Sequence, residues 1–290
     1  MIALFKILRP AQWTKNFFVF AALIFSLNFL NPALLCKVLF AFVIFCLLSS
    51  AIYIVNDIRD AENDRKHPQK KFRPIANGQV KLPQALGLAL VLLFIAIPAS
   101  LYLDSAFALV ALSYVLLMLL YTFLIKEMVI FDVFAIAAGF VLRAVAGVVV
   151  IDVSLSPWLI LCTILLSLFI GFGKRRHELL TLGEGSDHRR SLKDYNPQLL
   201  DQLISVVAGA TIVAYAIYCL WPDTVIKFGT KNLFYTIPFV IYGIFRYLYL
   251  IYKKDEGGRP EKILLTDIPL IIDILLWIAA LAIIVYWIKI

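Results

Sequence analysis

The sequence predicts an all-α polytopic membrane protein, a bundle of nine transmembrane helices with two large polar loops on one side. Of the 290 residues, 62% are hydrophobic and only 16% are charged, and the mean hydropathy is +0.91. An ordinary soluble domain carries about 25% charged residues, and one soluble core of this size cannot hide so much apolar surface. The composition therefore excludes a soluble enzyme, a disordered chain and a disulfide scaffold.

Nine stretches are apolar and long enough to be candidate spans, since a span takes about 20 residues. They are residues 16–30, 37–55, 84–103, 105–125, 130–151, 157–173, 200–221, 232–252 and 268–288. The runs are too continuously apolar for barrel strands, so we expect helices. The first stretch is the shortest of the nine.

Lys and Arg are concentrated on one side of these spans. The N-terminal segment and the loops after spans 2, 4, 6 and 8 hold 21 of the 27 Lys and Arg residues, and the opposite side holds 4. This bias places the N-terminus and both large loops in the cytoplasm and Ile290 outside a cytoplasmic (inner) membrane. The net charge of +8 is thus explained by topology, and we expect membrane lipids and no nucleic acid as partners.

The first large loop begins with four polar residues at helical spacing: Asn56, Asp57, Asp60 and Asp64. If the helix of span 2 continues, the three carboxylates share one face at i, i+3 and i+7. Oxygen ligands of this kind suit Mg²⁺, which takes one or two carboxylates and completes its shell with waters and phosphates. The alternative is a solvated helix end neutralised by Arg59 and Arg65. The order of the residues, directly after an apolar span, favours a metal–diphosphate site.

The same loop then becomes basic. The cations are Arg65, Lys66, Lys70, Lys71 and Arg73. Carboxylates and cations so close together suit a magnesium-bound phosphoester, with the remaining phosphate charge on Lys and Arg. The alternative is the cytoplasmic charge bias together with attraction to anionic lipids.

The Asn56–Asp64 stripe after the second of nine spans resembles the first aspartate motif of the UbiA-type prenyltransferase superfamily. This resemblance implies a single transmembrane domain over residues 1–290, with loops at about 56–83 and 174–199 capping a central cavity. Typical members ionise an isoprenoid diphosphate and prenylate an aromatic acceptor, using a second Asp-rich motif after the sixth span.

The second loop departs from that pattern. Lys174, Arg175, Arg176 and Glu178 stand where the family has aspartates, and a DxxxD motif is absent. Such a site suits a donor with an additional phosphate. The departure resembles the decaprenyl-phosphate phosphoribosyltransferase branch. Further similar segments are Leu8–Asn16, Asn56–Gly78, Asp132, Gly139–Ala144, Gly171–Leu179 and Ser191–Tyr195.

The resemblance implies transfer of 5-phosphoribose from phosphoribosyl diphosphate (PRPP) to a polyprenyl phosphate, with release of diphosphate. The product would be an arabinose precursor for the cell envelope. Mg²⁺ is the implied cofactor. The phosphate acceptor is already an anion near pH 7, so the reaction needs no general base. Catalysis would rest on neutralising the leaving group and on positioning.

Roles follow as expectations. The metal and diphosphate ligands are Asn56, Asp57, Asp60 and Asp64, and the catalytic residues are Asp57, Asp60, Lys174 and Glu178. Phosphate-binding residues on the donor side are Lys71, Arg73, Lys174, Arg175 and Arg189. Glu178 would hold a ribose hydroxyl or a metal-bound water, Tyr195 would close over the ribose, and Lys15 would meet the lipid phosphate.

Four ionisable residues lie within or near span ends, where they are costly and usually face the bundle interior. Asp132 and Arg143 are about three helical turns apart, on one face, and cannot pair directly. We expect Arg143 to line the cavity and to orient the acidic site or the lipid phosphate. Arg246 and Asp273 lie at similar depth, and a structural salt bridge between them is expected.

Two alternatives remain. A conventional aromatic prenyltransferase of the same fold is disfavoured by the missing second Asp motif. A transporter would show polar or broken helices at mid-bilayer, whereas the polar residues here cluster in two loops. The sequence leaves the lipid chain length and the existence of a homo-oligomer open.

Overall fold

The protein is helical throughout the part of the chain that the structure describes. The computed structural model describes residues 2–26, 28, 30–182, 190–254, 257–258 and 260–286. Every regular element in these ranges is a helix, and none of the described residues forms a strand. Eight helices are long and apolar enough to cross a membrane. The predicted all-α class is therefore confirmed.

The eight candidate spans match the second to ninth predicted stretches. They are α3 (Pro32–Arg59), α5 (Leu82–Leu103), α6 (Ser105–Phe123), α7 (Phe131–Val150), α8 (Pro157–Leu182), α9 (Pro197–Leu220), η5 (Asn232–Thr236) continued by α11 (Ile237–Lys253), and α13 (Ile268–Tyr286). The shorter helices are α1 (Ile2–Ile7), η1 (Pro10–Phe20), α2 (Ala21–Phe25), α4 (Ala61–Lys66), η2 (Lys70–Phe72), η3 (Ile125–Glu127), η4 (Arg190–Asp194), α10 (Pro222–Phe228) and α12 (Pro260–Thr266). Helices α3 and α8 extend beyond the apolar stretches because hydropathy detects only the apolar part of a helix.

The first predicted stretch, 16–30, is not one long α-helix. Its residues lie in the 3₁₀ helix η1 and in α2, which ends at Phe25. A 3₁₀ helix rises about 2.0 Å per residue and an α-helix about 1.5 Å, so η1 and α2 together rise about 30 Å. That is the thickness of the hydrocarbon core, but a ninth crossing stays a prediction.

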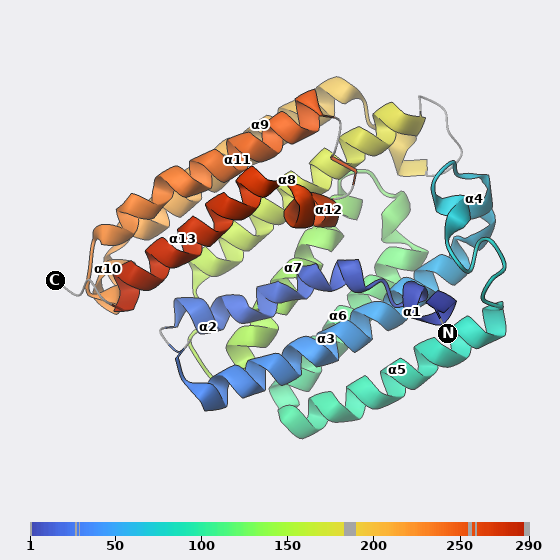
Figure 1. Ribbon diagram of the computed structural model, residues 1–290, viewed down its shortest axis with the longest axis horizontal. Coiled ribbons are helices and arrows are strands. Elements are labelled where there is room, and N and C mark those ends of the chain that lie inside the picture. Colours follow the sequence, from blue (N-terminus) through green and yellow to red (C-terminus); the bar gives the residue numbers. More distant parts are fainter. Residues whose placement is uncertain are drawn as a thin grey trace. The chain divides into compact units, whose positions relative to one another are not determined.

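The described chain divides into two compact units. The first holds the residues up to Leu155 together with Arg190 and Ser191, and the second holds the others from Ser156 onward. In the first unit α3 packs against α5, α6 against α7, and η1 against both α7 and α3. In the second unit α8 packs against α9, and α11 packs against α9 and α13 (Figure 1).

Small side chains bring α3 and α5 close together in the first unit. Ala51 of α3 and Ala85 and Ala89 of α5 are fully buried or nearly so, and small residues let membrane helices approach closely. Ile75 and Val80 of the first polar loop join the same core. Burial of one such side chain contributes about 1.5–3 kcal/mol, so the loop is anchored to the spans that it connects.

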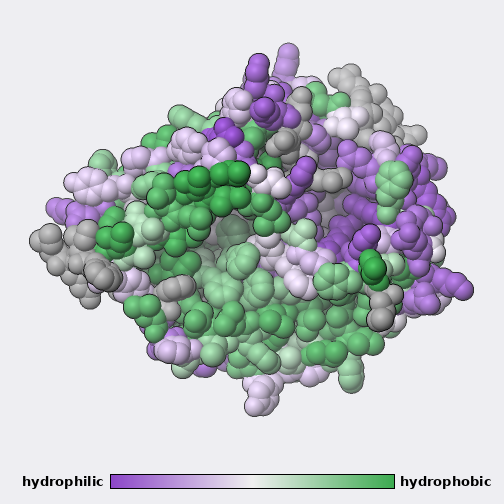
Figure 2. All heavy atoms as spheres, viewed as in Figure 1, coloured by the Kyte–Doolittle hydropathy of each residue, from purple (hydrophilic) through white to green (hydrophobic). Residues whose placement is uncertain are grey.

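Polar and apolar surfaces are separated in the first unit. Figure 2 shows hydrophilic residues gathered over α4 and its following loop, and hydrophobic residues over α3 and α5. Large apolar side chains on α5 are openly exposed, among them Phe94 and Tyr102. This is the surface expected of helices that face lipid.

One predicted ion pair is wrong. Arg246 binds Asp267 and not Asp273: its Nε and Nη2 donate to the two carboxylate oxygens of Asp267 at 3.0 and 2.8 Å. Asp267 precedes α13 and also accepts from the backbone N–H of Leu270 at 3.0 Å. A carboxylate at a helix N-terminus is stabilised by the exposed N–H groups, which makes Asp267 the better partner. Asp273 lies more than a turn further along α13.

Candidate functional site

The acidic cluster, defined as Asp57, Asp60 and Asp64, lies at the junction of α3 and α4. Helix α3 ends at Arg59 and α4 begins at Ala61. The backbone bonds Asp60 N to Asn56 O and Asp64 N to Asp60 O, at 2.9 and 2.8 Å, carry the helical path through the junction. Asp57 and Asp64 are buried. The expected continuation of the helix is thus present, with a bend at Asp60.

One arginine joins two of the three carboxylates. Arg73 Nη1 donates to Asp57 Oδ1 at 3.1 Å and to Asp64 Oδ2 at 2.6 Å. Arg9 Nη2 donates to the same Asp57 oxygen at 2.5 Å. Two carboxylate oxygens therefore flank a single positive nitrogen, which is the kind of position that a metal cation takes.

The third carboxylate turns to a different cation. Asp60 is paired with Lys126 of η3, and Ser191 Oγ donates to the backbone carbonyl of Lys126 at 3.0 Å. The alternative partners considered for the stripe are engaged elsewhere. Arg59 pairs with Glu127 at 3.7 Å, and Arg65 Nε donates to Ala76 O at 3.1 Å.

The chemistry of the cluster fits Mg²⁺ held by two carboxylates. Among the described residues, no three His, Cys, Asp or Glu side chains converge closely enough to hold a metal ion. Mg²⁺ in phosphate-handling sites needs only one or two carboxylates, with waters and phosphate oxygens as its other ligands. Asp57 and Asp64, which share Arg73 Nη1, are the pair that meets this requirement, and Asp60 stands apart with Lys126.

Burial and charge oppose each other at Asp64. Desolvation raises the pKa of its carboxyl above the usual value, and Arg73 and Lys70 offset part of that rise. Lys71, the lysine expected to bind donor phosphate, is exposed and lies over the ring of its neighbour Phe72. Lys70 is the lysine whose charge acts on the cluster.

Arg143, a buried residue of α7, hydrogen-bonds to protein groups of η1, α6 and α7 itself. It is 4% exposed. Nε donates to Asn16 Oδ1 at 2.7 Å, Nη1 to Gly139 O at 2.9 Å, and Nη2 to Tyr114 OH at 2.7 Å. All three guanidinium nitrogens thus bind protein atoms, which favours a supporting role over direct contact with substrate.

The N-terminal cations lie over one aromatic ring. The guanidinium carbon of Arg9 is 5.1 Å and Lys15 Nζ is 5.9 Å from the ring centroid of Tyr53. Tyr53 precedes Asp57 by one helical turn of α3. Arg9 has φ of 54°, a left-handed conformation that costs about 1–2 kcal/mol for a residue with a side chain. Such strain is concentrated at functional sites.

The three consecutive cations of the second unit do not form one patch. Successive residues of a helix point about 100° apart. Arg175 is buried and pairs with Glu178, whereas Arg176 Nε donates to Asp201 Oδ1 at 2.6 Å. Lys174 is half-buried. Arg176 therefore ties α8 to α9, and its guanidinium also lies 4.3 Å from the ring centroid of Tyr252 on α11.

The remaining predicted site residues are placed as follows. Asn56 is half-buried in the last turn of α3. Tyr195 is buried, between η4 and α9. Arg189 lies outside the described residues.

Sequence reasoning missed two cations of the site, Arg9 and Lys126. They are 48 and 66 positions from their carboxylate partners, so local spacing gives no sign of the pairing. The available signal was their location, because both lie on the predicted side where Lys and Arg are in excess, each next to a predicted span.

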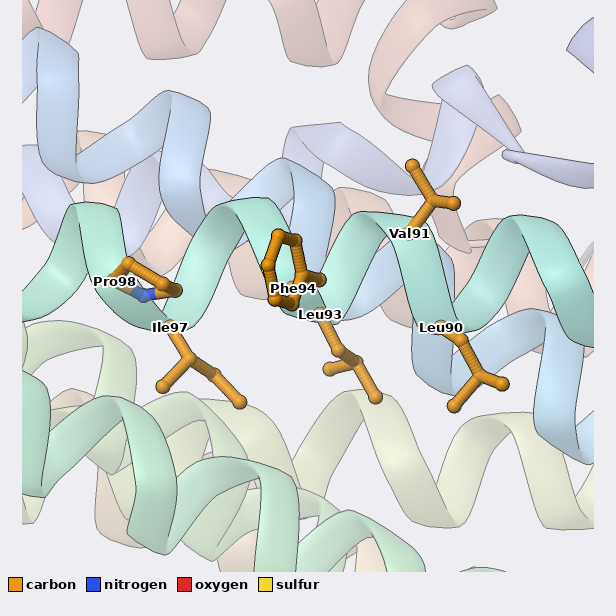
Figure 3. A pocket seen from close by; sticks show the side chains of 6 residues that line it. All are labelled: Leu90, Val91, Leu93, Phe94, Ile97 and Pro98. Carbon is orange, nitrogen blue, oxygen red and sulfur yellow. The ribbon is translucent and has the colours of Figure 1, made fainter.

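An apolar pocket on α5, away from the acidic cluster, has no side chain that could act in catalysis. It is lined by six residues of one helix, α5: Leu90, Val91, Leu93, Phe94, Ile97 and Pro98 (Figure 3). No charged or hydrogen-bonding side chain is among them. We interpret it as lipid-facing surface.

Comparison with known proteins gives a family. The UbiA prenyltransferase family model matches residues 16–266. Decaprenyl-phosphate phosphoribosyltransferase of Corynebacterium glutamicum is 37% identical, over 97% of this chain and 86% of the relative. The protein of the same name from Mycolicibacterium smegmatis is also 37% identical, over 98% of this chain and 92% of the relative.

Solved structures agree in fold. A UbiA homolog from Archaeoglobus fulgidus bound to DMAPP and Mg²⁺ superposes with a TM-score of 0.71 at 17% identity, covering 97% of this chain and 98% of that chain. The same homolog bound to Cd²⁺ gives a TM-score of 0.68, also at 17% identity, over 96% of this chain and 97% of that chain.

Proposed function

Because the chain belongs to the UbiA prenyltransferase family and is an integral membrane protein, we propose that it transfers 5-phosphoribose from PRPP to a polyprenyl phosphate, with diphosphate as leaving group. The observation that carries the proposal is the 37% identity, over nearly the whole chain, to relatives named decaprenyl-phosphate phosphoribosyltransferase. The charges of this chain support it. Cations replace the second Asp-rich motif, as a donor with an additional phosphate requires.

The acidic cluster is the proposed diphosphate end of the site. Asp57 and Asp64 would hold Mg²⁺, and Asp60 and Asn56 are the further candidate ligands. Mg²⁺, when bound, neutralises the negative charge that develops on the leaving diphosphate. Arg9, Arg73 and Lys126 are now paired with the carboxylates. With Mg²⁺ bound at the carboxylates, Arg9, Arg73 and Lys126 would bind the diphosphate oxygens.

Two of those cations, Arg73 and Arg9, are held in place by the fold. Arg73 sits in a loop anchored by Ile75 and Val80, and Arg9 is fixed at the start of η1. Charge-assisted hydrogen bonds from such groups contribute about 1.5–3 kcal/mol each. A guanidinium binds two phosphate oxygens at once, so Arg9 and Arg73 orient the leaving group as well as neutralising it.

The acceptor and the rest of the donor are assigned from residue chemistry. Lys15 binds the phosphate of the lipid acceptor, whose oxygen attacks the anomeric carbon without a general base. Lys174 and Arg175 bind donor phosphate, Glu178 a ribose hydroxyl, and Tyr195 covers the ribose. We also assign Lys71 and Arg189 to the binding of donor phosphate. Arg143 acts through Asn16.

The membrane and its sides are part of the proposal. The excess of Lys and Arg, 21 residues against 4, supports a cytoplasmic N-terminus and site, with the C-terminus outside the cytoplasmic membrane. PRPP is water-soluble and the acceptor is a lipid, so a site at the cytoplasmic edge of the bilayer reaches both.

The donor identifies the reaction. Purified protein is incubated with Mg²⁺ and either labelled PRPP plus polyprenyl phosphate, or labelled prenyl diphosphate plus an aromatic acid. We expect the label of PRPP to appear in the polyprenyl lipid. The label of the prenyl diphosphate should remain in that unreacted substrate. The reverse result would show a conventional prenyltransferase and contradict the proposal.

The metal ligands are tested in the same assay. Asp57→Ala and Asp60→Ala are expected to abolish magnesium-dependent transfer. Each variant should keep the size-exclusion profile and the unfolding temperature of the wild-type protein. Asp223→Ala is the matched control, since this exposed aspartate lies on α10, outside the cluster. Full activity of Asp57→Ala would rule out the assigned metal site.

A further inference from the structure

The N-terminal segment η1 is an unusually long 3₁₀ helix. It runs for eleven residues, Pro10–Phe20, whereas 3₁₀ runs longer than three or four residues are uncommon because their hydrogen-bond geometry is poorer. Something other than the backbone must therefore hold it. With three residues per turn, side chains three apart form straight rows along the helix.

One row carries the anchoring contacts. Its members are Trp13, Asn16 and Val19. Trp13 Nε1 donates to Ser50 Oγ of α3 at 3.0 Å. Asn16 is fully buried, and so is Val19. A Cβ placed on Gly147 of α7 would lie 2.0 Å from the carbonyl oxygen of Val19, so the glycine is what allows η1 to pack directly on α7.

Asn16 is the centre of this row. Its amide nitrogen donates to Ser49 Oγ at 3.2 Å and to Cys46 Sγ at 3.3 Å, both on α3. Its oxygen accepts from Arg143 Nε at 2.7 Å, from α7. Asn16 thus joins η1 to two spans, and the buried guanidinium makes its bond a charge-assisted one.

A neighbouring row leads to the candidate site. Arg9, which caps η1, and Lys15 both lie over Tyr53. The third row, with Ala11 and Phe17 exposed, faces outward. If η1 became α-helical, residues six apart would shift by about 3 Å along the axis and about 120° around it. Lys15 and Arg9 would then no longer meet at one ring.

We propose that Asn16 is a positioning residue: by accepting from Arg143 it keeps residues 10–20 in the 3₁₀ conformation that directs Arg9 to Asp57 and holds Lys15 over the ring of Tyr53. The catalytic consequence rests on the proposed function. The structural consequence does not, and the two are measured separately.

Backbone hydrogen exchange of the purified protein tests the structural part. Asn16→Ala is expected to raise exchange rates at least 10-fold across residues 13–20. Thr14→Ala, on the same segment, is the control and leaves them unchanged, because Thr14 bonds only Ala11 O. Asn16→Asp retains the acceptor for Arg143 and keeps slow exchange. Unchanged exchange in Asn16→Ala overturns the proposal, whatever the substrate is.

Arg143→Lys covers the case in which Asn16→Ala does not fold. It keeps the charge but cannot reach Asn16, Gly139 and Tyr114 together, so exchange in residues 13–20 rises as well. If this variant keeps slow exchange, the proposal is also overturned.

A double-mutant cycle tests the catalytic part. A displacement of about 1 Å costs up to about 100-fold in rate, so Asn16→Ala should lower kcat/KM by about 10- to 100-fold and Asn16→Asp by much less. If Asn16 acts through Lys15, Asn16→Ala costs less than about 3-fold in a Lys15→Ala background. Full additivity of the two losses would show independent effects and overturn the positioning role. Faster exchange in Asn16→Ala, in a protein that never uses PRPP, would refute the proposed function alone.

Discussion

Gly147→Ala is a substitution whose consequence follows directly from distances. The added Cβ would lie 2.0 Å from the carbonyl oxygen of Val19 and 2.9 Å from its carbonyl carbon, whereas ordinary contact begins at 3.4 Å. Both atoms belong to the backbone of η1, so no side chain can rotate away. Helices α7 and η1 must therefore separate by more than about 1 Å.

The change in the free energy of unfolding has two destabilising contributions and one stabilising contribution. Overpacking of a buried contact costs about 1–3 kcal/mol. The separation stretches the 2.7 Å bond from Arg143 to Asn16, and loss of a hydrogen bond to a charged group costs about 1.5–3 kcal/mol. Replacing glycine by alanine within a helix returns about 0.5–1 kcal/mol. The net destabilisation expected for Gly147→Ala is about 2–5 kcal/mol.

Thermal unfolding of the purified protein measures this effect. Gly147→Ala should lower the midpoint temperature and reduce phosphoribosyl transfer by up to about 100-fold, since η1 carries Arg9 and Lys15. Gly87→Ala is the matched control. Gly87 lies on α5 of the same unit with no atom within 4 Å of an added Cβ, so its stability should stay the same or rise slightly. Native stability and full activity in Gly147→Ala would refute the packing argument.

Three further outcomes are expected. Lys126→Met removes the cation paired with Asp60 and should weaken PRPP binding by about 10- to 100-fold; an unchanged KM would show that Lys126 only neutralises the carboxylate. Chelation of divalent metal should abolish transfer, with recovery on added Mg²⁺, and activity in the chelator would exclude metal assistance. The Arg246 hydrogen bonds hold the pKa of Asp267 below its usual value, so the stability they contribute is complete above about pH 4 and is lost as the pH falls through the lowered pKa. The difference in unfolding temperature between wild type and Asp267→Asn should accordingly be full at pH 7 and shrink in acid, and a difference that grows in acid would reverse the assignment.

The candidate site was only partly predictable. The proximity of Asp57 and Asp64 could be predicted from spacing because the helical path continues through the junction of α3 and α4, but Asp60 pairs separately with Lys126. The sequence-based pairing of Arg246 failed because two aspartates, Asp267 just before α13 and Asp273 within it, were both within plausible reach. Only the helix start at Ile268 decides between them, since it supplies the N–H of Leu270 to Asp267.

The class of the protein, eight of its candidate spans and the charge asymmetry of its loops were determined by the sequence alone. Hydropathy and helical spacing are local properties, and a bilayer forces apolar runs of sufficient length into helices. The partners of the carboxylates, by contrast, come from distant segments, as with Arg9 and Asp57. Tertiary structure alone decided these pairings and the 3₁₀ form of η1, because both depend on how closely η1, α3 and α7 pack. The fully buried Asn16 and the bare backbone at Gly147 set that closeness.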